Sequence, residues 1–273
     1  MQTAAQTRLT TEGKPEMALK ASNETISIAP IDTGVVNLAI IGNTPLYHHA
    51  MAEKARRTLL LGGGKKTSAE KAANVKHDPV EEYRASCYKI ADDTAPTLIA
   101  MPAPAFKGVM RTAALDLPGT KRTEIGRLCW IEGYLVGIYG VPRLSMSVVR
   151  SADMARTPDI RTRAVMTEWA CVISVSYVKP KLNQNSVVNL IAAGGITCGI
   201  GDWRQEKGSG SHGQFRIVGP NDKDFERILK NGGRAAQQQA LAEPECYDAE
   251  TEDLFAWYEA EIKRTGRGLK AVA

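Results

Sequence analysis

The segment Trp169–Val178 carries the alternation of side chains that most constrains the fold, because it is typical of a β-strand with one buried face. Its apolar side chains fall on alternate positions: Cys171, Ile173, Val175 and Tyr177. Such a strand requires hydrogen-bonded neighbours, so the chain must contain a sheet. A short helix is predicted next at 185–193, ending at Gly194-Gly195, and a last strand at 215–218.

The first half of the chain supplies the remaining elements. Val35–Ile41 has the composition of a buried strand, ended by Gly42-Asn43-Thr44-Pro45. Apolar stripes at helical spacing predict helices at 48–61 and 105–115, and Pro102 and Pro104 mark the start of the second helix. Further strands are predicted at 81–90, 97–101, 130–139 and 143–150, and an arginine-containing loop at 151–163.

This order of elements is strand, helix, several strands, helix, strand. It favours an α+β fold of the ferredoxin-like or RRM type, in which an antiparallel sheet has its helices on one face. We expect a flexible N-terminal arm at 1–30 and a core domain at 31–220 that contains a basic insertion at 62–80. Residues 221–273 are predicted to form a helical, acidic C-terminal tail.

The charge of the chain is distributed unevenly. The formal net charge is +5, but residues 241–262 contain eight acidic residues and no lysine or arginine, which leaves +13 for the rest of the chain. A concentrated positive charge favours a polyanionic partner, although a solvated surface with an acidic tail explains it equally well. The acidic tail could also shield a basic groove until nucleic acid displaces it.

Cysteine usage and hydropathy give expectations about location. The five cysteines form no CxxC pair, which is typical of a reducing compartment and indicates neither a zinc site nor disulfides. No apolar stretch is long enough for a membrane span, and the polar N-terminus does not have the pattern of a secretory signal. We therefore expect a cytoplasmic protein without a membrane partner, metal or cofactor.

Seven glycines lie within the twenty residues from Gly194 to Gly213. This density implies close approach of backbones or positive φ angles. Trp203, Arg204, Lys207 and His212 are interleaved with the glycines. Backbone amides exposed by glycine could bind a phosphate, while arginine and lysine add charge and the rings stack on bases. The alternative is a bent connection before a bulged last strand. A dinucleotide or P-loop site is excluded, because the run follows a helix and contains no GK[ST].

Three segments in this order resemble motifs of the RAMP superfamily of CRISPR-associated proteins. The glycine run followed by Gly213-Gln214-Phe215-Arg216-Ile217 resembles the glycine-rich loop of that superfamily, and Met101–Thr112 is similar to the start of its first major helix. Asn43-Thr44-Pro45-Leu46 resembles a third, weaker element. The resemblance spans roughly residues 35–218 and extends to solitary relatives in mobile elements or phages.

The resemblance implies an RRM-like fold that binds single-stranded nucleic acid, with guide RNA expected ahead of DNA. It implies a non-enzymatic backbone subunit that polymerises along the RNA into a helical ribonucleoprotein for antiviral defence, with copies of itself and other effector subunits as partners. The residues expected to contact nucleic acid come from the α-helical motif, the glycine run, the arginine-containing loop and the basic insertion: Lys65, Lys66, Lys107, Arg111, Arg150, Arg156, Arg161, Arg163, Gly199, Gly201, Trp203, Arg204, Lys207, Gly208, Gly210 and His212.

Other functions remain open from the sequence. A metal-independent endoribonuclease of the same superfamily could use His48 or His49, which follow the first strand, as a general base that removes a 2′-OH proton. Alternatively, these histidines cap a helix or bind RNA without cleaving it. A phage single-strand DNA binding or annealing protein, and a structural assembly protein that binds no nucleic acid, are further alternatives.

Overall fold

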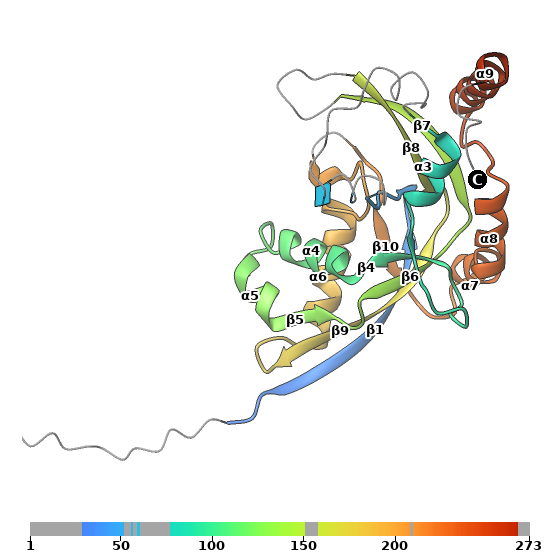
Figure 1. Cartoon of the computed structure of the whole chain (residues 1–273). Helices are drawn as coiled ribbons and strands as arrows, with labels where there is room; N and C mark the ends of the chain where they lie inside the picture. The colour runs from blue at the N-terminus through green and yellow to red at the C-terminus, as the bar shows by residue number, and fades with distance from the viewer. Residues whose placement is uncertain are drawn as a thin grey trace, which may run out of the picture. The chain divides into compact units, whose positions relative to one another are not determined.

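The structure is a computed structural model that describes residues 29–51, 56, 59–60, 77–150, 158–207 and 210–266. Figure 1 labels its elements. The strands are β1 (Asp32–Gly42), β2 (Leu46–Tyr47), β3 (Tyr88–Lys89), β4 (Ile99–Pro102), β5 (Cys129–Ile131), β6 (Leu135–Tyr139), β7 (Pro142–Arg150), β8 (Pro158–Met166), β9 (Ala170–Lys179) and β10 (Phe215–Val218). The helices are α3 (Pro79–Ala85), α4 (Ala103–Ala113), α5 (Arg122–Leu128), α6 (Gln184–Thr197), α7 (Lys223–Asn231), α8 (Arg234–Ala242) and α9 (Ala249–Thr265), with a 3₁₀ turn at Gln205–Lys207.

The main sheet confirms the predicted α+β, ferredoxin-like class. Its strands run in the order β10-β1-β9-β6-β4-β3, all neighbours are antiparallel, and β5 also pairs with β9. Taken along the chain as β1, α4, β6, β9, α6 and β10, the central strands have the spatial order four, one, three, two. This is the order of a split strand–helix–strand fold, in which each helix connects two strands that are not neighbours.

The main core lies between this sheet and the helices α4 and α6, which lie together on one side of the sheet in Figure 1. Alternate residues of β1, namely Val36, Leu38 and Ile40, face this core, whereas Val35 and Asn37 are exposed, so the strand predicted as buried has one exposed face. On the opposite face, α7 packs Phe225 and Ile228 against Ile41 and Ala170. The outer face is therefore partly covered by a smaller, second core.

A second sheet, in the order β2-β8-β7, continues the first through bends in the chain. The bend between β6 and β7 depends on Gly140, whose φ is +147°, because an added Cβ would lie 2.5 Å from the carbonyl oxygen of Glu168. The predicted loop at 151–163 is wrong in its second half. Residues 158–163 belong to β8, so Arg161 and Arg163 project from a strand.

Two further secondary-structure predictions are wrong. The first half of the segment predicted as a strand at 81–90 belongs to α3, and only Tyr88–Lys89 forms a strand, β3. The Asp78 carboxylate caps α3 by accepting from the Glu81 amide, and Pro79 occupies the first turn. The helix predicted to begin at His48 does not begin there. His48 extends the edge of β8 instead, because its amide donates to the Ala164 carbonyl.

The acidic tail is helical and integrated into the unit that extends from Asp32 onward. Leu144 of β7 receives a hydrogen bond from the Tyr247 amide and donates one to the Glu245 carbonyl. Thr251 is fully buried, and its hydroxyl accepts from the Met146 amide. The tail therefore completes the edge of β7, and its role as a displaceable shield stays a prediction.

The predicted N-terminal arm falls almost wholly outside the described residues, as do residues 62–76 of the basic insertion with Lys65 and Lys66. No helix among the described residues combines the length and the apolar character that a membrane crossing requires.

Gln237 of α8 joins the helical tail to the main sheet. Its side chain is fully buried, and Oε1 accepts from the amides of Leu98 and Ile99 at 2.8 and 2.9 Å. Its Nε2 donates to the carbonyls of Ile138, Gly140 and Gly232.

Replacing Gln237 by alanine should destabilise the fold by roughly 3–5 kcal/mol, because it leaves several buried backbone groups without partners. Urea unfolding followed by circular dichroism measures the change. Gln238→Ala, at an exposed position of the same helix, is the matched control and should change stability little. Equal unfolding midpoints for the two variants would contradict the role assigned to Gln237.

Candidate nucleic-acid interface

Two of the predicted motifs meet in the structure, although about 90 residues separate them in the sequence. The side of α4 that does not face the sheet lies opposite the start of the glycine run, and the two enclose a cleft of about 280 Å³. Its lining includes Gly108, Arg111 and Thr112 of α4, Gly199, Gly201, Arg204 and Glu206 of the glycine run, and Arg122 at the start of α5. We call this space the α4 cleft.

The α4 helix is positioned by its apolar stripe. Phe106, Val109, Met110 and Ala113 are buried against the core, so Gly108 and Arg111 are directed to the side. A Cβ added to Gly108 would have no neighbour within 4 Å. Glycine inside a helix lowers its stability, and no packing contact within the described part of the fold requires it here.

The first two glycines of the run have a different role from the one predicted. Gly194 and Gly195 lie inside α6, which continues to Thr197, and do not cap it. A Cβ at Gly194 would lie 2.3 Å from Cγ1 of Val109, and one at Gly195 would lie 2.4 Å from the carbonyl oxygen of Phe215. These glycines permit α6 to contact both α4 and β10.

The following glycines fold the loop against its own chain. Gly199 and Gly201 have φ angles of +70° and +82°, and side chains at either position would collide with backbone atoms of other segments. The amides of Gly199, Ile200, Asp202 and Gly213 donate to the carbonyls of Gly194, Gly213, Tyr47 and Pro45, respectively. The interpretation of these amides as a phosphate cradle is therefore wrong, because they are already used within the chain.

Gly210 also belongs to this internal packing, since a Cβ there would lie 1.7 Å from the Trp203 carbonyl oxygen. Lys207 ends the 3₁₀ turn, and Gly208 lies outside the described residues. The described part of the glycine run is thus packed against its own chain, and its polar side chains determine what the cleft can bind.

The rings of the glycine run pack inward. Trp203, whose φ is +54°, and His212 both contact Tyr47, with ring centroids 5.4 and 4.9 Å from that of Tyr47. The guanidinium carbon of Arg163 lies 5.0 Å from the centroid of Trp203. This cluster attaches the glycine run to the second sheet, and stacking of a base on Trp203 or His212 stays a prediction.

Three arginines and one carboxylate determine the charge of the α4 cleft. Arg204 donates from Nε to Glu206 at 2.8 Å and from Nη1 to the Gly201 carbonyl at 3.0 Å. Glu206 also accepts from the Thr112 hydroxyl at 3.0 Å. Nε of Arg111 is buried without a partner, and no ion pair of Arg122 with another described residue is present. The cleft therefore keeps an excess of positive charge.

Several predicted contact residues lie elsewhere. Lys107 of α4 does not line the cleft. Arg150 and Arg161 are exposed on β7 and β8, whereas Arg156 is outside the described residues. Arg163 is 3% exposed and its Nη2 lies 3.2 Å from the Asp202 carboxylate, so it does not extend into solvent from a loop as the sequence analysis expected.

The two histidines after β1 differ sharply. His48 is fully buried, neither ring nitrogen has a hydrogen-bond partner among the described residues, and burial lowers its pKa to about 4. A bound strand cannot reach it, so His48 is excluded as a general base for RNA. His49 is exposed, and partial burial lowers its pKa below the usual range. It lines a different pocket, beside Arg161 and Arg163.

Arg122, Thr112 and Glu206 line the α4 cleft but were not singled out from the sequence. Arg122 follows Gly119-Thr120-Lys121 in a segment without a motif. Arg122 reaches the cleft because α5 packs against α4. Gly126 permits this close packing, since an added Cβ at that position would lie 3.0 Å from Nε of Arg111.

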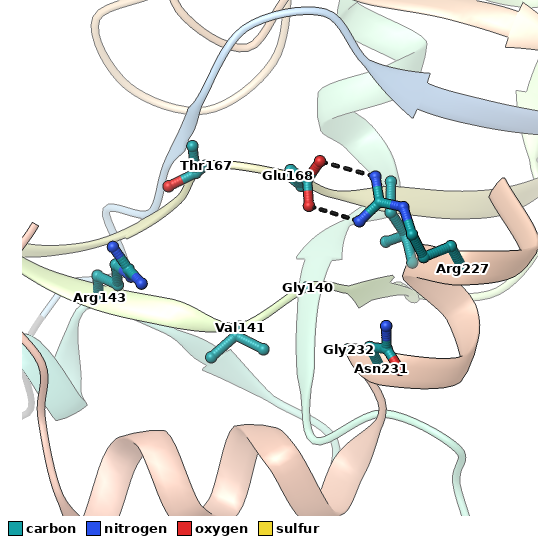
Figure 2. Close-up of a pocket in the computed structure, with 9 residues that line it drawn as sticks. Gly140, Val141, Arg143, Thr167, Glu168, Arg227, Asn231 and Gly232 are labelled. Atoms are coloured by element: carbon teal, nitrogen blue, oxygen red, sulfur yellow. Dashed lines mark hydrogen bonds and ion pairs between the residues drawn. The ribbon is translucent and has the colours of Figure 1, made fainter. Parts of the chain in front are cut away.

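Figure 2 shows another cleft, of about 300 Å³, between the Gly140 bend and α7. Its guanidinium groups already have partners. Arg227 donates to both carboxylate oxygens of Glu168 at 2.7 and 2.8 Å, and Arg143 lies 3.4 Å from Glu245. The α4 cleft is the better candidate site because its cations are not all paired.

Comparison with known proteins does not assign a family. No family model matches the chain, and no curated protein matches it. Among solved structures, the chain is similar to Cmr6 from Pyrococcus furiosus, with 8% sequence identity and a TM-score of 0.35. That match covers 68% of this chain and 98% of Cmr6. A likeness at this level carries no argument about function.

The packing of the two helices predicts opposite effects for two glycine substitutions. Gly108→Ala should stabilise the fold by about 0.5–1 kcal/mol, because alanine favours the helix and meets no neighbour. Gly194→Ala should destabilise it by roughly 1–3 kcal/mol, because the methyl group would overlap Val109. Thermal unfolding measures both changes, and a loss of stability in Gly108→Ala would show that position 108 is packed.

Proposed function

We propose that this protein binds single-stranded nucleic acid, RNA in preference to DNA, with its sugar–phosphate backbone in the α4 cleft. The observation that carries the proposal is that Arg111 and Arg122 line the same cleft as Gly108. A Cβ added at Gly108 would have no neighbour within 4 Å, so the helix is open to close approach there. Arg111 and Arg122 can donate to phosphate oxygens, and Gly108 lets a backbone approach the helix closely.

The charge of the cleft supports a polyanion over a single carboxylate. Because Arg204 is occupied by Glu206 and the Gly201 carbonyl, Arg111 and Arg122 supply most of the free charge. These two lie on different helices, and contact with both of them favours a ligand that carries several anionic groups. A strand with one phosphate per nucleotide meets this requirement without any contact to base edges, which makes the binding tolerant of sequence.

The role of the protein within an assembly is the finer part of the proposal. The three sequence motifs that resemble those of the RAMP superfamily support a backbone subunit that assembles with copies of itself along a guide RNA. Electron microscopy of the protein with and without a long RNA tests this role. Helical particles that form only with RNA would support it, and particles of one size in both samples would contradict it.

Replacing Arg122 by alanine should weaken binding of a fluorescein-labelled 20-nucleotide RNA about three- to tenfold, because one phosphate contact is lost. The slope of log K against log salt should fall by roughly 0.7. Arg127→Ala is the matched control, since Arg127 is exposed on the same helix but does not line the cleft. Fluorescence anisotropy at several salt concentrations measures both variants, and equal losses would contradict this placement of the strand.

The same titration with DNA of identical sequence tests the preference for RNA through the 2′-hydroxyl. Tighter binding of DNA would instead support the single-strand DNA binding or annealing alternative, and absence of binding to either would support a purely structural protein.

The ribonuclease alternative depends on His49 alone, because His48 is buried. If it is correct, labelled RNA incubated with the protein in EDTA should be cleaved, and His49→Ala should abolish the cleavage. The binding function predicts intact RNA in both samples.

A further inference from the structure

A second pocket, of about 520 Å³, lies along β8 and shares no lining residue with the α4 cleft. The side chains that give it its chemistry are polar or charged: His49, His77, Glu82, Asp159, Arg161 and Arg163. They come from the segment after β2, from the start of α3 and from β8. We call it the β8 pocket.

The most unusual group in its wall is Arg163. The residue is 3% exposed, and one of its nitrogens, Nη2, lies 3.2 Å from Asp202. Its Nε and Nη1 are buried and have no hydrogen-bond partner within the described chain. A buried guanidinium with unpaired N–H groups is costly, and oxygen acceptors on a bound anion would remove that cost. Trp203 holds the guanidinium in place from one side.

Arg161 supplies a second cation to the same end of the pocket. It lies two positions before Arg163, so both project from the same face of β8, about 6.6 Å apart along the strand. The pairing of Arg161 with Ser147 and of Arg163 with Ser145 fixes this arrangement. Because Arg161 is exposed and His49 lies nearby, this end of the pocket is open to a ligand.

The opposite end is rich in carboxylate oxygens. Nδ1 of His77 lies 2.8 Å from Glu82, and Nε2 lies 3.1 Å from Asp159. Asp159 precedes Arg161 by two positions and shares its face of the strand. The pocket therefore has a cationic end and an end with hydrogen-bond acceptors. Arg161 and Asp159, which belong to these two ends, are two positions apart on β8.

We infer that the β8 pocket binds a nucleoside phosphate, with the phosphate against Arg161 and Arg163 and the ribose hydroxyls donating to Asp159 and Glu82. The polarity of the ligand matches that of the pocket, because its anionic group and its hydroxyl donors lie at different ends. A plain phosphate would make no contact with the carboxylates of Asp159 and Glu82, and an uncharged nucleoside would leave Nε and Nη1 of Arg163 without acceptors. This binding does not depend on a strand in the α4 cleft.

Adenosine 5′-monophosphate is a suitable probe and can be titrated into the full-length protein by calorimetry at fixed ionic strength. We expect saturable binding by the wild-type protein. Arg161→Ala should weaken it roughly tenfold, the loss expected for one charge-assisted hydrogen bond. Arg150→Ala, which removes an exposed arginine from the paired strand, is the matched control and should not change the affinity. Absence of saturable binding, or equal affinity of the Arg161→Ala and wild-type proteins, would overturn the inference.

A second measurement tests the ribose end without any change to the protein. Adenosine 5′-monophosphate should bind at least several-fold more tightly than its 2′,3′-dideoxy analogue and than inorganic phosphate. Equal affinity for all three probes would overturn the nucleoside part of the inference. A competition experiment shows whether the phosphate belongs to a free mononucleotide or to the end of a strand. A 5′-phosphorylated oligonucleotide that displaces the mononucleotide, when its 5′-hydroxyl counterpart does not, would identify a strand end as the ligand, whereas no displacement would identify a free mononucleotide.

The two sites fail independently. Arg122→Ala should retain mononucleotide binding while it loses affinity for the RNA strand. Arg161→Ala should retain affinity for the RNA strand while it loses mononucleotide binding. Loss of both activities in both variants would indicate one common site and would contradict the separate β8 pocket.

Discussion

The close contact between α4 and α6 at Gly194 is the interaction on which the arrangement of the α4 cleft depends. A side chain at this position would overlap Val109, and one at Gly195 would overlap Phe215. Because both positions are glycine, α6 lies deep between α4 and β10, and the loop that follows it emerges beside Gly108. The contact also joins the two helices of the split strand–helix–strand fold, so the core and the cleft are determined by the same packing.

The sequence predicts most elements of the main sheet, and the errors have physical causes. The strands β1, β9 and β10 and the helix α4 follow from local alternation or apolar spacing, which residues near in sequence define. A glycine pair such as Gly194-Gly195 can end a helix or permit it to contact another segment closely, and the local sequence does not distinguish the two. The nearby Val109 in the structure shows that Gly194 permits a contact. Similarly, the pattern at 158–163 alternates like a strand, but three arginines among residues 156–163 suggested a solvated loop.

The candidate site divides in the same way. Arg111, Arg204 and the glycine run could be selected from the sequence because each belongs to a recognisable motif, and these motifs meet in the α4 cleft. Arg122 could not be selected, because its role depends on the contact of α5 with α4. Burial also cannot be read from residue type: Arg163 and Arg161 are separated by one residue, yet Arg163 is paired with Asp202 under Trp203 and Arg161 is exposed.

The position of the acidic tail explains how a chain with eight clustered acidic residues can keep a basic cleft. Hydrogen bonds between Leu144 and the 245–247 segment hold the tail on the edge of β7, and Figure 1 shows α9 at β7 and α4 on the other side of the main sheet from α8. None of the acidic residues of this tail lines the α4 cleft. The tail therefore stabilises the second sheet, and the only carboxylate among the residues that line the cleft is that of Glu206.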